Sequence, residues 1–176
     1  MKKNLVNGMK VLSVIIMLAF IAPAVVNAQA GKANFAGNWA YNAEKSQVGQ
    51  GGNGGGRGFG GGDMVVKQEA NLLTVETTRP GRDGGAPTTT TMKYTLDGKE
   101  SINTSQRGDS KSTATWAPDG KSLKIATART FNMNGESRTM NSTEVWTLTN
   151  ANTLSVARTM TTQNGDMTTT MVYEKK

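Results

Sequence analysis

From Met64 to the C-terminus, apolar and polar residues alternate along the chain in short runs. Leu73-Thr74-Val75, Leu123-Lys124-Ile125 and Leu154-Ser155-Val156 show this period of two, which is typical of half-buried β-strands. No window has the apolar spacing of an amphipathic helix. Turn signals separate the runs, at Asp97-Gly98, Pro118-Asp119-Gly120, Asn134-Gly135 and Asn164-Gly165. The pattern predicts an all-β domain of about eight to ten strands.

The same three runs form a weak internal repeat. Each begins a strand that continues to an arginine, and the chain then turns and returns to an aromatic residue, at Tyr94, Trp146 or Tyr173. Trp116 ends a fourth, less regular hairpin. Because the next strand starts soon after each aromatic residue, neighbouring strands are expected to be antiparallel and sequential. Such an up-and-down meander hides its edges best by closing into a barrel.

Residues 1–30 are predicted to be a cleaved signal peptide. Lysines precede an apolar stretch from Val11 to Val26, and Ala28-Gln29-Ala30 favours cleavage before Gly31, with cleavage after Ala28 as the alternative. A retained membrane anchor is disfavoured, because the stretch is shorter than the roughly 20 residues of a spanning helix and contains Pro23. The chain has no cysteine to carry a lipid or form a disulfide. We therefore expect a periplasmic or secreted protein whose mature form has no integral membrane span.

The mature domain, residues 31–176, is interrupted by a glycine-rich segment at 49–62. So many glycines cannot hold a strand or helix at an acceptable entropic cost, which favours a flexible insertion. A phosphate-binding loop is the alternative, but such a loop opens a helix, whereas Asp63 and the strand-like Met64-Val65-Val66 follow here.

Removal of the leader lowers the formal net charge from +7 to +4, because three of the 20 Lys and Arg residues and none of the 13 Asp and Glu residues lie in it. The remaining excess is spread along 146 residues with few aromatic residues among the basic ones. It is not the basic stripe of a nucleic-acid-binding protein, so no nucleic-acid partner is expected. It does suit anionic surfaces or ligands.

The first segment of the mature chain resembles the start of lipocalins and related calycins. Asn34-Phe35-Ala36-Gly37-Asn38-Trp39 matches their G-x-W signature, with Phe35, Gly37 and Trp39 as its motif residues. Tyr41 to Ser46 and Trp116 to Leu123 are similar to segments of small secreted bacterial lipocalin-like proteins. The resemblance implies an up-and-down barrel in which Trp39 plugs one end beneath a basic side chain. Arg158 or Lys175 would supply that side chain.

Alternation also places several arginines on the same strand faces as the apolar residues. These are Arg79, Arg129, Arg138 and Arg158, and Phe131, Trp146 and Glu144 share the faces. In one interpretation the strands run past the core, the arginines lie at the rim and Glu144 pairs one of them. In the other, the guanidinium groups face a cavity and bind a carboxylate or phosphate above an apolar interior. The candidate ligand-binding residues are therefore the four arginines with Trp146 and Phe131.

Neither metal binding nor catalysis is expected of this chain. Mature-chain methionines, among them Met92, Met140, Met160, Met167 and Met171, could hold Cu(I), but methionine is more often an adaptable core residue, so no metal or other cofactor is expected. The chain has neither histidine nor cysteine, and its acids are scattered without a spacing that suggests a catalytic pair. No catalytic residue is predicted, and we expect the protein not to be an enzyme.

The function expected from the sequence is that of an exported lipocalin-like binding protein for a small amphipathic or anionic ligand. The alternative is a filled-core structural or interaction domain that contacts envelope proteins or polymers and takes no small molecule. An outer-membrane barrel is disfavoured, because the outward-facing positions carry Thr, Ser, Lys and Glu instead of an apolar band.

Overall fold

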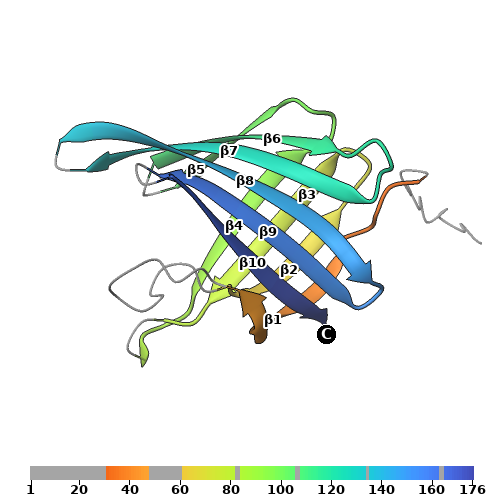
Figure 1. Cartoon of the computed structure of the whole chain (residues 1–176). Coiled ribbons are helices and arrows are strands. Elements are labelled where there is room, and N and C mark those ends of the chain that lie inside the picture. The colour runs from red at the N-terminus through yellow and green to blue at the C-terminus, as the bar shows by residue number, and fades with distance from the viewer. Residues whose placement is uncertain (1–30, 48–60, 82–83, 106–107, 134, 163–164) are drawn as a thin grey trace, which may run out of the picture.

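The structure is a computed structural model that describes residues 31–47, 61–81, 84–105, 108–133, 135–162 and 165–176. Within these ranges the chain forms ten β-strands, as the alternation predicts (Figure 1). The strands are β1 Gly37–Gln47, β2 Asp63–Gln68, β3 Leu72–Arg79, β4 Thr88–Thr95, β5 Glu100–Ser105, β6 Gly108–Trp116, β7 Ser122–Met133, β8 Glu136–Asn150, β9 Thr153–Thr162 and β10 Gly165–Lys175.

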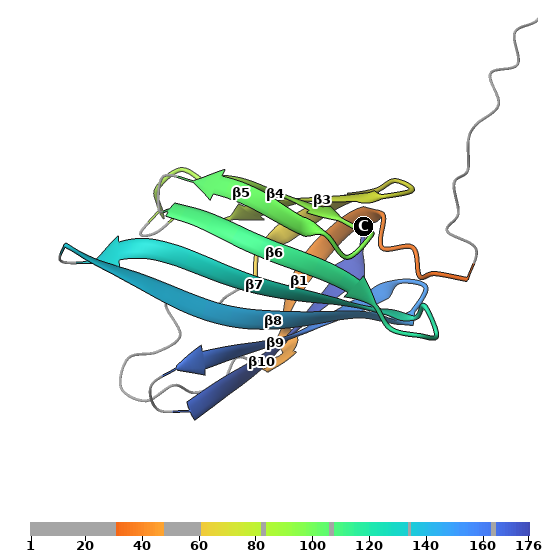
Figure 2. The ribbon, with the colours of Figure 1, turned by 90° about the horizontal axis from the view of Figure 1, so that it is seen from above.

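The strands form one antiparallel sheet in the order β4-β3-β2-β1-β10-β9-β8-β7-β6-β5. Every neighbour in this order is also a neighbour in sequence except β1 and β10, which pair with Trp39 opposite Lys175 and Tyr41 opposite Tyr173. The sheet curls so that its two outer strands, β4 and β5, come together (Figures 1 and 2). The predicted meander is confirmed, and it forms a nearly closed barrel.

Side chains bridge the seam between β4 and β5 in place of a backbone ladder. The Lys93 amide donates to Asn103 Oδ1 at 2.8 Å, and Asn103 Nδ2 donates back to the Lys93 carbonyl at 3.0 Å. The Thr95 amide donates to Ser101 Oγ at 2.8 Å. An asparagine amide offers both a donor and an acceptor, so Asn103 satisfies an edge that would otherwise present unpaired backbone groups.

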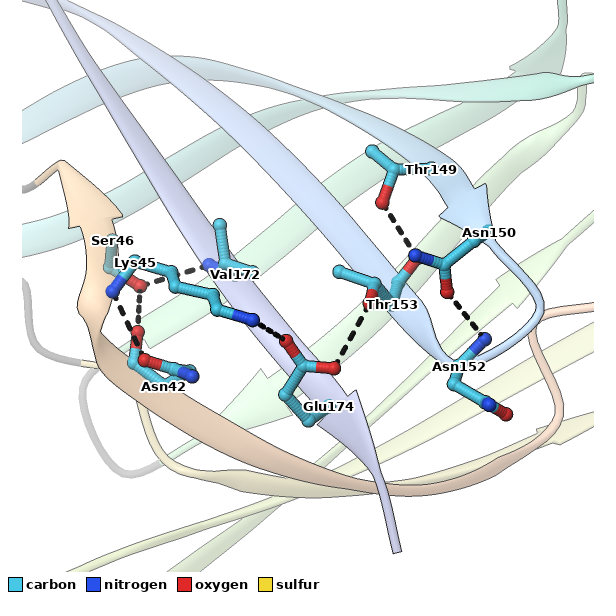
Figure 3. A network of polar contacts seen from close by, with 9 residues as sticks. All are labelled: Asn42, Lys45, Ser46, Thr149, Asn150, Asn152, Thr153, Val172 and Glu174. Carbon is cyan, nitrogen blue, oxygen red and sulfur yellow. Dashed lines mark hydrogen bonds and ion pairs between the residues drawn. The ribbon is translucent and has the colours of Figure 1, made fainter.

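Figure 3 shows a second irregularity of the ladder, where the register of β1 against β10 shifts between Asn42 and Gln47. Ser46 Oγ accepts from the Val172 amide at 2.9 Å and donates to the Asn42 carbonyl at 2.6 Å, so its hydroxyl bridges the two strands at the shift. Beside it, Lys45 and Thr153 both donate to the Glu174 carboxylate. Their hydrogen bonds hold the pKa of Glu174 below its usual value.

The apolar residues of the predicted repeat all lie in the core. Leu73, Leu123 and Leu154 are fully buried, and their i+2 partners Val75, Ile125 and Val156 are at most 5% exposed. Because side chains alternate between the two faces of a strand, the intervening Thr, Lys and Ser residues lie on the opposite, outer face of the sheet. These residues pack with Trp39 and Phe35 in a single cluster.

Trp39 closes one end of the barrel, as the resemblance implies. Its ring is fully buried, and Nε1 donates to the Phe35 carbonyl at 2.9 Å. Of the two basic residues that could cover it, Lys175 does so, with Nζ 5.7 Å from the ring centroid. Gly37 has a φ of 149°, and a Cβ there would lie only 3.1 Å from Lys175 Cε. The glycine of the G-x-W motif thus leaves room for the lysine that covers its tryptophan.

An aromatic stack completes this closed end. Phe35 stacks on Trp116 with centroids 5.7 Å apart and meets Trp146 edge-on at 5.8 Å. The segment that carries Phe35 is tied across the end by the Ala33 amide, which donates to the Gly120 carbonyl at 2.8 Å. Residues 31–36 therefore act as part of the barrel floor, and the opposite end holds the β3–β4, β7–β8 and β9–β10 hairpins.

Two predictions concern residues that the structure leaves undescribed. The predicted signal peptide, 1–30, lies outside the described residues, as does most of the glycine-rich segment, from 48 to 60. Its last two residues are described: a Cβ on Gly61 would collide with the Tyr41 ring, and one on Gly62 with the Thr78 carbonyl. Close approach explains glycine at these two positions.

No helix within the described ranges is long and apolar enough to cross a membrane.

Candidate functional site

Above its closed end the barrel encloses a cavity of about 300 Å³. Strands β2 to β4 and β6 to β10 all contribute to its wall. The apolar lining residues are Met64, Val75, Met92, Tyr94, Met140, Trp146, Val156, Met160, Met171 and Tyr173. The polar ones are Thr77, Arg79, Thr90, Ser110, Thr127, Arg129, Ser142, Glu144 and Arg158.

Strand β6 explains why the interior is not filled. Its inward positions carry the small residues Ser110, Ser112 and Ala114, each at most 1% exposed, before Trp116 ends the strand. Of these, Ser110 lines the cavity, and its small side chain leaves space that the methionines and aromatic residues of the facing strands do not occupy. Every second residue back from Trp116 in the sequence is one of this set, so alternation along β6 is the signal that identifies it.

The structure brings four of the six predicted ligand-binding residues to the cavity. Arg129, Arg158 and Trp146 lie inside, the arginines half-buried and the tryptophan buried. Arg79 also lines it but is exposed, at the last position of β3. Arg79 therefore marks the rim, and the other two arginines lie deeper in the same space.

Arg138 and Phe131 are not part of the cavity lining. They lie opposite each other on β8 and β7, past Arg129 and Ser142, the last residues of these strands that pair with β6 and β9. The β7–β8 hairpin reaches beyond its neighbouring strands (Figure 2). Arg138 Nη2 is 3.3 Å from Glu136 Oε2, and both side chains are at least half exposed. The prediction that these two residues share the ligand site depends on alternation alone, and the strands continue past the cavity before reaching them.

The two deeper arginines each have a polar partner across the sheet. Arg129 Nε donates to Ser110 Oγ at 3.1 Å, and the two residues are paired in the ladder. Arg158 faces Glu144, with Nε 3.8 Å from Oε1, while the other carboxylate oxygen accepts from Trp146 Nε1 at 3.1 Å. At that distance the Arg158–Glu144 contact is an ion pair without a hydrogen bond.

Positive charge exceeds negative charge in the cavity. Three arginines and one glutamate line it, which gives a formal balance of plus two. Arg158 Nε is buried and has no hydrogen-bond partner within the described part of the chain. A buried donor without a partner costs about 1–3 kcal/mol, so an acceptor placed here would gain from satisfying it.

Two tyrosine hydroxyls of the lining stay protonated at neutral pH. Burial raises the pKa of Tyr94 well above its usual range, and the charge of Glu144 adds to the rise, while Arg158 and Arg129 oppose it. Burial, again with Glu144, raises the pKa of Tyr173 in the same direction. Tyr173 donates to Met171 Sδ at 3.5 Å. The sequence pattern marks both tyrosines only as aromatic strand ends and does not place them in a cavity.

We expect alkali to destabilise the barrel through these two tyrosines. Above about pH 10, the usual tyrosine pKa, the unfolded chain releases protons that the folded chain keeps, so the free energy of unfolding falls as the pH rises. The slope should approach about 1 kcal/mol per pH unit for each buried tyrosine. Urea unfolding between about pH 8 and 11 measures it. Tyr94→Phe should roughly halve the slope, and an unchanged slope would contradict the assignment.

The methionines that the sequence singled out also gather here. Met92, Met140, Met160 and Met171 line the cavity together with Met64, whereas Met167 does not. Within the described ranges, no three or more Asp or Glu side chains come together as metal ligands. The arrangement offers an anion two guanidinium groups and neutral hydroxyls, above a wall of thioethers and rings.

Comparison with known proteins bears on the fold. No protein-family model matches the chain, and no curated protein matches it. Among solved structures, the chain is similar to the zebrafish ileal bile acid-binding protein in complex with cholic acid, with a TM-score of 0.54 and 16% sequence identity. The match covers 81% of this chain and 98% of that one. The chain therefore shares the fold of that protein, a lipocalin-like, nearly closed antiparallel β-barrel.

Proposed function

We propose that this protein is exported and non-catalytic, and that it binds a small amphipathic anion inside its barrel. The observation that carries the proposal is the pair of half-buried arginines, Arg129 and Arg158, in a cavity with only one carboxylate. Charges removed from water without a matching partner are costly, and a carboxylate or phosphate would offset that cost with charge-assisted hydrogen bonds. The apolar wall around them suits the rest of an amphipathic molecule.

The size of the cavity and the structural neighbour support the same proposal. About 300 Å³ corresponds to roughly ten water molecules, so there is room for one small ligand. The neighbour is by name a bile acid-binding protein and was solved with cholic acid, which is itself an amphipathic acid. A filled-core interaction domain, the alternative left by the sequence, is less favoured because the barrel is not packed solid.

Export rests on the leader at residues 1–30, and the mass of the processed protein should correspond to a start at Gly31.

Calorimetric titration of residues 31–176 with decanoate and with decanol tests the binding proposal. Decanoate should bind and decanol, which lacks the charge, should bind at least tenfold more weakly. Arg129→Met and Arg158→Met should each weaken decanoate binding by about ten- to a hundredfold, as expected when one charged hydrogen-bond donor is lost.

Lys124→Met is the matched control, since Lys124 is an exposed cation on the outer face of β7. It should leave the affinity unchanged. If neither compound binds, or if the arginine variants bind decanoate as well as the control does, the proposed site is wrong.

A further inference from the structure

The apolar wall of the cavity has an unusual composition. Of its ten apolar residues, five are methionines and three are Tyr or Trp, and none is Leu or Ile. Leu and Ile are not scarce in the molecule: Leu73, Leu123, Ile125 and Leu154 are all buried in the core without lining the cavity. Apart from Val75 and Val156, the chain thus places methionines and aromatic rings at the cavity wall and keeps its larger branched aliphatic residues, Leu and Ile, for packing in the core.

Thioethers and rings differ from aliphatic groups in what they contact best. A methionine sulfur is polarisable and makes favourable contacts with the edges of aromatic rings. Aromatic side chains add edge-to-face and offset stacking with another ring, and a guanidinium group stacks on ring faces. A polymethylene chain would gain equally from Leu or Val. A wall of methionine, tyrosine, tryptophan and arginine therefore favours a ring system over an alkyl chain.

The register places these groups beside the charges. Met140 is the cross-strand partner of Arg129, and Met160 follows Arg158 by two residues on the same face of β9. Directly paired residues have Cβ atoms about 4.5–5.5 Å apart. Each half-buried guanidinium group thus has a thioether as its neighbour on the cavity wall. An acid group held by the arginines would have its attached ring among the methionines, with no long spacer between them.

From this arrangement, we infer that the ligand class of the cavity is a compact aromatic carboxylate, with its acid group at Arg129 and Arg158 and its ring against Met140, Met160 and the aromatic wall. The inference rests on the proposed function and narrows it. A cavity of about 300 Å³ suits one or two fused rings with an acid group. The excess of positive charge argues against the soft cation that clustered methionines could otherwise bind.

Three acids with the same number of non-hydrogen atoms test the inference by calorimetry on residues 31–176. They are 2-naphthoate, its saturated analogue decahydro-2-naphthoate, and undecanoate. The first two share a carbon skeleton and differ in aromaticity, and the third replaces the rings by a chain. We expect 2-naphthoate to bind at least tenfold more tightly than either of the others.

Variants of the wall show whether the thioethers cause the preference. Met140→Leu and Met160→Leu conserve volume, so the barrel should fold normally, as a thermal unfolding scan would verify. The double variant should lower the ratio of naphthoate to decahydronaphthoate affinity at least threefold. Met167→Leu, outside the cavity lining, should leave the ratio unchanged.

The outcomes separate this inference from the function on which it rests. If the acids bind but decahydronaphthoate or undecanoate binds as tightly as naphthoate, the aromatic class is wrong and anion binding stands. A preference for naphthoate that survives the double variant also overturns the assignment to the methionines. If none of the three acids binds, the proposed function itself fails.

Discussion

Replacing Trp39 by alanine is expected to lower the free energy of unfolding by about 3–5 kcal/mol, the range for removing a large buried aromatic residue. The ring is fully buried at the closed end, so its loss would leave a cavity between Phe35 and the neighbouring strands. It would also remove the donor to the Phe35 carbonyl and the surface on which the Lys175 side chain lies. Urea unfolding followed by far-ultraviolet circular dichroism measures the loss.

Two further variants separate the causes of this effect. Trp39→Phe keeps a ring but loses the Nε1 hydrogen bond, and we expect a smaller loss of about 1–3 kcal/mol. Val145→Ala is the control, since Val145 is on the same sheet but 37% exposed, and it should cost well under about 1 kcal/mol. A loss at Trp39→Ala no larger than that of the control would contradict the role of Trp39 as the plug of the barrel.

The fold could be predicted because the sequence repeats one simple physical signal. A strand with one buried face needs an apolar residue at every second position, and Leu73, Leu123 and Leu154 each begin such a run and are each fully buried. Turn signals between the runs made sequential antiparallel pairing the simplest arrangement. The position of Trp39 followed from its place in the G-x-W motif, just before the meander.

The choice between Arg158 and Lys175 as the cover of Trp39 could not be made from the sequence, because it depends on register. Trp39 lies directly opposite Lys175 in the β1–β10 ladder. Arg158 is on β9, one strand beyond β10, and pairs with Glu144 of β8. Nothing local in the sequence specifies which residues of two distant strands become partners.

Depth in the barrel was the other property that the sequence could not supply. Alternation tells which face a side chain occupies but not how far along the barrel it lies. Arg129 and Arg158 therefore looked equivalent to Arg79 and Arg138, although the first two line the interior and Arg138 lies outside the cavity lining, before the first residue of β8 that pairs with β9. The same limitation hid Tyr94 and Ser110, which the curvature of the sheet brings together with the arginines.

Removing Glu144, a polar residue of the cavity wall, is expected to lower the stability of the barrel substantially. Glu144→Leu would leave Arg158 without its counter-charge and Trp146 Nε1 without its acceptor, and Trp146 is only 3% exposed. An unsatisfied buried donor costs about 1–3 kcal/mol, and an uncompensated half-buried charge adds to it, so we expect a total loss of about 2–4 kcal/mol. Urea unfolding measures this loss too, with Glu76→Leu, at an exposed position of β3, as the control.

Glu144→Gln separates the charge from the hydrogen bond. The amide oxygen can still accept from Trp146 Nε1, so the stability loss should be under about 1 kcal/mol. The formal charge of the cavity would rise from plus two to plus three, and Arg158 would no longer be shared with a carboxylate. An anionic ligand such as decanoate should then bind about tenfold more tightly, with its affinity more sensitive to salt. Weaker binding of decanoate by this variant would mean that Glu144 orients Arg158 for the anion and does not compete with the anion for it.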